Sequence, residues 1–180
     1  YIKKKSKSTY RKKPFRKNLF IYGTTFGFGY FISGIHWITH SLTFDESFKI
    51  LIPFGLIFIP LFLSLFFSII TLLIGPFLKL NFLSILIFSG GLAFSDYLRA
   101  KILTGFPWNV WIYSFSWSPE IIQILDKLGL FALNLIILTI FLAPSVLFFK
   151  VSFRQKFFYI SFLALIIFSF FIYGNPSINK

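Results

Sequence analysis

Residues 50–78 read ILIPFGLIFIPLFLSLFFSIITLLIGPFL and contain no Asp, Glu, Lys or Arg. An α-helix rises about 1.5 Å per residue, so about 20 apolar residues cross a hydrocarbon core about 30 Å thick. This run therefore predicts a helix that spans a membrane. The stretch 80–95 reaches that length only if it includes Asp96 and continues to about Leu98. The same length test is passed by three other uncharged stretches, residues 18–44, 128–149 and 157–179.

The composition of the 180-residue chain agrees with membrane residence. It is 57% hydrophobic and only 13% charged, with a mean hydropathy of +0.82. Soluble domains carry about 25% charged residues, so a soluble globule is excluded, and 29 Phe exclude a disordered coil. We expect an all-α, polytopic membrane protein with a basic segment 1–17 and a transmembrane domain 18–180. Its spans are expected at about 20–43, 51–74, 80–98, 129–149 and 157–174.

The segment 99–128 is expected to be an interfacial or re-entrant loop. Residues 104–119 read TGFPWNVWIYSFSWSP, which is uncharged but contains two prolines, a glycine and an asparagine. Helix breakers combined with Trp and Tyr are typical of the membrane–water interface or of backbone that re-enters without crossing.

The charges predict the orientation of the chain. Nine basic residues and no acid lie in residues 3–17. With five spans and a cytoplasmic N-terminus, the inner side carries 13 basic residues and no acid, while the outer side carries all five acids and five basic residues. This asymmetry satisfies the positive-inside rule and places the C-terminus outside. The alternative for a basic run is nucleic-acid binding, but its position before an apolar span favours a topology signal that also attracts anionic lipid headgroups.

The first expected span contains two patterns of small or ligating residues. Gly23, Gly27 and Gly34 share one face of an α-helix, which favours close packing against a neighbouring helix. His36 and His40 are four residues apart, a spacing that can hold a metal ion in an α-helix. Because no third ligand lies nearby in the sequence, we expect neither a metal nor a cofactor.

A pair of opposite charges ends the third expected span. Asp96 and Arg99 are three residues apart and can form an ion pair on one helix face. A charge near a membrane span is costly unless it is paired or hydrated. The two residues therefore indicate either a functional site or a simple ion pair at the interface.

Two motifs resemble a known family. Residues 96–108, DYLRAKILTGFPW, are similar to the E-x-L-R…L-T-G-F-P-W signature of apolipoprotein N-acyltransferase. Residues 27–37, GFGYFISGIHW, resemble its upstream G-F-G-x-F-x-x-G-I-x-W span. Asp96 replaces the family's Glu, and His36 stands where the family commonly has Asn.

The resemblance implies an eight-span bacterial inner-membrane enzyme with a nitrilase-like periplasmic domain. That family moves an acyl chain from a phospholipid to the N-terminal diacylglyceryl-cysteine amine of lipoproteins, through a Glu-Lys-Cys triad and a thioester. Since this chain has no Cys, we expect it to be the transmembrane part of such an enzyme, without the catalytic domain and inactive alone.

The residues expected to line a site for the phospholipid and the lipoprotein N-terminus follow from that signature. They are Asp96, Arg99, Thr104, Gly105, Phe106, Pro107 and Trp108, with Arg99 meeting a headgroup phosphate or pairing with Asp96. The alternatives are a helical membrane subunit of a transporter and a structural membrane anchor.

Overall fold

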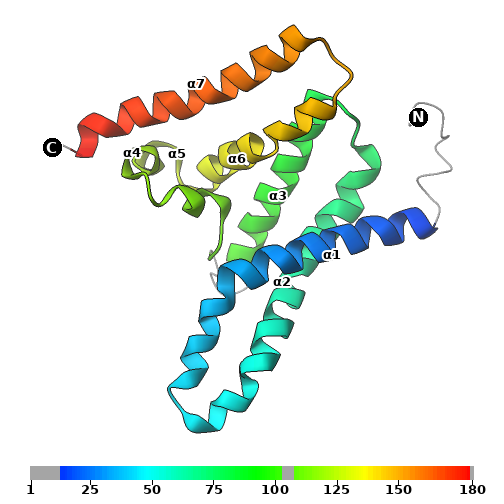
Figure 1. Cartoon of the computed structure of the whole chain (residues 1–180), viewed down its shortest axis with the longest axis vertical. Helices are drawn as coiled ribbons and strands as arrows, with labels where there is room; N and C mark the ends of the chain where they lie inside the picture. Colours follow the sequence, from blue (N-terminus) through cyan, green and yellow to red (C-terminus); the bar gives the residue numbers. More distant parts are fainter. Residues whose placement is uncertain (1–12, 103–107, 179–180) are drawn as a thin grey trace. The chain divides into compact units, whose positions relative to one another are not determined.

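The computed structural model describes residues 13–102 and 108–178 (Figure 1). Throughout these residues the chain is helical or irregular, and no strand is found in them. This confirms the all-α class. In chain order the helices are α1 Lys13–Ile35, η3 His36–Thr43, η4 Glu46–Leu51, α2 Ile52–Ile74, η5 Gly75–Phe77, α3 Phe82–Ile102, η6 Trp111–Phe115, α4 Pro119–Ile122, α5 Leu125–Leu128, α6 Leu130–Phe141, η7 Ala143–Phe148 and α7 Phe153–Ile178, where η marks a 3-10 helix.

Four helical stretches among the described residues are long and apolar enough to cross a membrane, which confirms a polytopic membrane protein. They are Glu46–Phe77, Phe82–Ile102, Leu130–Phe148 and Phe153–Asn175. The expected first span, 20–43, is helical but is not one of these four. Its α-helix ends at Ile35, where the chain bends and continues as the 3-10 helix η3 (Figure 1). A fifth crossing therefore stays a prediction.

The chain divides into two compact units, Tyr1–Phe77 and Leu78–Lys180. In the first unit, α1 and α2 form an antiparallel helical hairpin (Figure 1). Its core is aromatic: the rings of Phe31 and Phe67 meet edge to face at 5.5 Å, and both side chains are buried. Pro60 lies inside α2 and is buried, and α2 continues through it. Neighbouring helices allow a proline to remain within a membrane helix.

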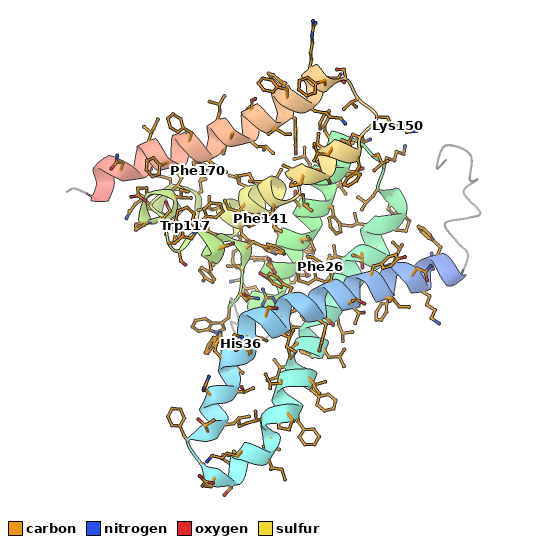
Figure 2. All side chains as sticks on the ribbon, in the orientation of Figure 1. Phe26, His36, Trp117, Phe141, Lys150 and Phe170 are labelled. Atoms are coloured by element: carbon orange, nitrogen blue, oxygen red, sulfur yellow. The ribbon has the colours of Figure 1, made fainter. Side chains whose placement is uncertain are left out.

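In the second unit, α3 packs against α6, and α7 packs against α4. One core cluster joins Val110 and Ile112 from the segment after α3 with Leu133 and Ile137 of α6 and Phe170 of α7. Figure 2 shows Phe170 on α7. The segment after α3 thus contributes two side chains to the core that it shares with α6 and α7.

The outward faces of the long helices are strongly apolar. On α7, exposed side chains include Phe157, Phe158, Leu165 and Phe168, each at least 60% exposed. Continuous apolar surface of this kind is unfavourable in water and normal in contact with lipid. The exposed apolar faces are therefore typical of a membrane protein.

Candidate functional site

The last turns of α3 hold a buried ion pair. The Arg99 Nη2 donates to Asp96 Oδ1 at 3.0 Å, and the two side chains are 1% and 2% exposed. The i,i+3 spacing places both groups on one face of α3, and that face is directed toward α6. A buried charge pair is stable only when its remaining donors and acceptors are also satisfied, so the other partners of the pair matter.

Arg99 also donates to the backbone that follows α3. Nη1 donates to the carbonyl of Trp108 at 2.7 Å, and Nη2 makes a longer contact of 3.5 Å with the carbonyl of Asn109. Of the two roles expected for Arg99, the pair with Asp96 is formed. A direct contact with a headgroup phosphate would require this enclosed guanidinium to be uncovered.

Asn134 of α6 completes the set of contacts. Its Nδ2 donates to Asp96 Oδ2 at 2.9 Å, and its Oδ1 accepts from the backbone N–H of Ile112 at 3.2 Å. The Asn134 side chain is fully buried. Asp96 therefore accepts on both oxygens, from α3 and from α6, which is the arrangement that an ionised carboxylate requires.

These contacts define a turn of five residues, 108–112, which we call the Trp108 turn. Asn109 has a φ of 59°, in the left-handed region that asparagine tolerates better than most residues. The carbonyl of Trp108 is held by Arg99, while its side chain is 52% exposed. Buried polar groups thus hold the backbone of the turn, and the indole ring of Trp108 is exposed at the surface.

Aromatic side chains continue beyond the turn. Phe115 stacks on Trp117 at 6.2 Å and on Phe141 of α6 at 6.0 Å, and Trp111 lies 5.7 Å from Phe141. Figure 2 shows Trp117 and Phe141 on the segment after α3 and on α6 respectively. Trp117 is 75% exposed. An exposed group of aromatic rings of this kind suits the headgroup region of a bilayer or the upper part of an acyl chain.

Near the end of the same segment, Lys127 and Asp126 form an exposed ion pair of 3.2 Å outside the spans. The hydrogen bond and the charge of the Asp126 carboxylate raise the pKa of the Lys127 ammonium above its ordinary value. Both side chains are more than half exposed, so water screens the pair and it contributes little to stability.

Sequence comparison identifies relatives of this chain. Residues 8–143 match the family model described as the apolipoprotein N-acyltransferase N-terminal domain. The chain is 35% identical over 130 residues to the apolipoprotein N-acyltransferase of Rhodopseudomonas palustris. That alignment covers 69% of this chain and 24% of the relative. The corresponding protein of Rickettsia prowazekii is 37% identical over 120 residues, covering 66% of this chain and 24% of the relative.

The chain belongs to the apolipoprotein N-acyltransferase family. It aligns with about a quarter (24%) of the length of these curated relatives. No solved structure matches it. The Asp96–Arg99 pair, the Trp108 turn and Asn134 all lie within the region that matches the N-terminal domain of the apolipoprotein N-acyltransferases. Helix α7, from Phe153 onward, lies beyond it.

The structure brings together three of the seven site residues expected from the sequence, namely Asp96, Arg99 and the backbone of Trp108. Thr104, Gly105, Phe106 and Pro107 lie outside the described residues. Sequence reasoning missed Asn134. The available signal was its position as the one asparagine in the uncharged run 128–149, because a polar side chain inside a membrane helix requires a partner.

The glycines of the first expected span lie where α1 meets α2. A methyl group at Gly23 would clash with the Thr71 hydroxyl and would lie 2.6 Å from Cα of Ser68. At Gly27 it would lie 3.0 Å from Cα of Ser64. Gly34 is half-buried near the end of α1. The helices therefore approach closely at Gly23 and Gly27.

The expectation that His36 and His40 share a helix face is wrong. Both lie in the 3-10 helix η3, which has about three residues per turn, so residues four apart point in directions about a third of a turn apart. The Nδ1 of His36 instead lies 3.0 Å from the carbonyl oxygen of Ser33.

Proposed function

We propose that this chain is the transmembrane, lipid-holding part of an enzyme that transfers an acyl chain from a phospholipid to the N-terminal amine of lipoproteins. Family membership supports the reaction class. The observation that supports the local role is the Trp108 turn, whose backbone is bound to Arg99 and Asn134 while its indole is half exposed. A ring held in this way contacts an acyl chain or the glycerol region without losing much conformational freedom on binding.

The proposed division of labour follows from the chemistry available in the chain. A thioester mechanism needs a thiolate nucleophile, and the 180 residues contain no cysteine. The acyl transfer itself is therefore assigned to parts of the enzyme outside this sequence, and the chain alone is proposed to be inactive. Asp96, Arg99 and Thr104–Trp108 are proposed to line or support the lipid site.

The proposed location is the bacterial inner membrane, with the N-terminus in the cytoplasm and the Trp108 turn on the outer side. This orientation is supported by the excess of Lys and Arg on the opposite side. It is tested by labelling in spheroplasts with an impermeant maleimide, since the chain has no native cysteine. Ser116→Cys, in the exposed segment after the turn, should label from outside, and Ser152→Cys, between η7 and α7, should not. The reverse pattern would reject the orientation.

The lipid-holding role is tested in a chimera that replaces the aligned region of the Rickettsia prowazekii relative with residues 8–143 of this chain. Trp108→Ala should lower the rate of lipoprotein N-acylation by about tenfold or more, because an aromatic anchor is lost. The matched control is Trp37→Ala, since Trp37 is 47% exposed and lies in the other unit. Product is measured by mass spectrometry, with protein level measured in the same membranes.

The outcomes of that experiment separate the competing functions. Normal acylation by the Trp108→Ala chimera would reject the site. Equal losses for Trp108→Ala and Trp37→Ala would also reject it. An unsubstituted chimera that is correctly inserted but inactive would favour a transporter subunit or a structural anchor.

A further inference from the structure

The hydrogen bonds around Asp96 form a closed circuit that begins and ends on the Trp108 turn. The carbonyl of Trp108 accepts from Arg99, whose Nη2 donates to Asp96 Oδ1. Asp96 Oδ2 accepts from Asn134, and Asn134 Oδ1 accepts from the N–H of Ile112. Both ends of the turn are therefore held by one set of contacts.

The direction of every bond in this circuit is fixed by chemistry. A backbone N–H can only donate, so the group that faces Ile112 must be the amide oxygen of Asn134. The amide nitrogen then faces Asp96, which must accept there, and the guanidinium of Arg99 can only donate on the other side. The two ends of the Asn134 amide meet both requirements while position 96 carries a carboxylate.

We infer that Asn134 is the positioning residue of this site. It connects the Asp96–Arg99 pair of α3 by hydrogen bonds to the far end of the Trp108 turn, and so sets the placement of the Trp108 ring. The consequence for lipid rests on the proposed function, whereas the consequence for the turn does not. Asn134 touches no exposed surface, since it is fully buried, so it acts through the turn and not by contact with a substrate.

The other polar contact between α3 and α6 provides a matched comparison. The hydroxyl oxygen of Thr139 of α6 lies 2.9 Å from the hydroxyl oxygen of Ser89 of α3, and it lies 2.9 Å from the carbonyl oxygen of Leu135. Both side chains are buried, and within the described residues they bond to each other and to the carbonyls of Leu86 and Leu135 on their own helices, not to the Trp108 turn. Thr139→Val thus removes an interhelical hydrogen bond between the same two helices while leaving the circuit intact.

The experiment uses the full 180-residue chain in lipid nanodiscs. Amide hydrogen exchange of a peptide containing residues 108–112 reports on the turn, and crosslinking of Trp108-containing peptides to a phosphatidylethanolamine with a diazirine in its acyl chain reports on lipid contact. Asn134→Leu should raise exchange at the Ile112 amide by about tenfold or more, because that N–H loses its acceptor. Thr139→Val should leave exchange in that peptide unchanged.

The decisive variants exchange the two polar groups. Asn134→Asp alone places a second carboxylate against Asp96, and Asp96→Asn alone removes the charge that Arg99 pairs with; each should loosen the turn. The double variant, Asp96→Asn with Asn134→Asp, again satisfies every bond: the new carboxylate accepts from Ile112 and from the new amide, whose oxygen accepts from Arg99. It should restore slow exchange to within about threefold of the parent chain.

A helix-packing role for Asn134 predicts something different. If Thr139→Val loosens the turn as much as Asn134→Leu, or if the double variant is no better than the worse single variant, the inference is overturned. If exchange follows the predicted pattern but crosslinking at Trp108 is the same in every variant, Asn134 still positions the turn and the lipid-holding function is rejected instead.

Discussion

The two compact units use different chemistry to bring membrane helices together. In the first unit, α1 and α2 meet through glycine and hydroxyl side chains: Gly23 lies against Ser68, and Thr24 and Ser68 share a hydrogen bond of 2.7 Å. In the second unit, α3 and α6 meet through the Asp96–Arg99 pair and Asn134. Small residues allow close packing at little desolvation cost, whereas buried charges are costly to place in a membrane.

The comparison separates a contact that packing explains from one that packing alone does not explain. The α1–α2 contact is fully explained by packing, since its groups are small and make short local bonds. The α3–α6 contact includes an arginine that is 1% exposed, although an apolar residue of similar size would pack there without desolvating a charge. That arginine donates to the carbonyls of Trp108 and Asn109, contacts that an apolar residue could not make.

The largest expected effect comes from breaking the charge pair. Arg99→Met leaves the Asp96 carboxylate buried without its counter-charge, which costs about 3–5 kcal/mol where a buried pair is broken. The free energy of unfolding, measured by denaturant titration in mixed micelles, should fall by that order. The double variant Arg99→Met with Asp96→Leu should lose less than Arg99→Met alone, and a greater loss would show that the pair is not the source of the effect.

A smaller effect is expected from adding a methyl group where α1 and α2 approach closely in the first unit. Gly23→Ala places a methyl group against the Thr71 hydroxyl and the backbone of Ser68, and overpacking of this kind costs about 1–3 kcal/mol. Gly29→Ala is the control on the same helix, because nothing lies within 4 Å of its added methyl group. It should be neutral or stabilising, since alanine favours a helix. Equal unfolding midpoints for the two variants would contradict the close packing of α1 on α2.

The smallest effect is expected from removing one hydroxyl. Thr24→Val deletes the hydrogen bond to Ser68, and such bonds between membrane helices contribute about 0.6 kcal/mol on average. Thr25→Val is the control, because within the described residues the Thr25 hydroxyl bonds to the Ile21 carbonyl of its own helix and not to α2. A difference well above 1 kcal/mol between the two unfolding free energies would mean that the first unit also depends on a strong polar contact.

The sequence predicted the membrane helices well because lipid imposes a simple rule. A run such as 50–78 must become a helix in a bilayer, where each backbone group needs an internal partner. The predicted core at 51–74 corresponds to α2, Ile52–Ile74. The bend at Ile35 was not predicted, because glycine, threonine and tyrosine make the first apolar run a weak helical signal and its path depends on packing against α2.

Composition, the uncharged runs and the LTGFPW motif determined the class, the family and the position of the candidate site, since these depend only on residue type and order. The tertiary structure decided how that site is built. Asn134 is 38 residues from Asp96, and no periodicity or spacing connects them. Their contact exists only because α3 and α6 pack together and the Trp108 turn brings the N–H of Ile112 to the same buried amide.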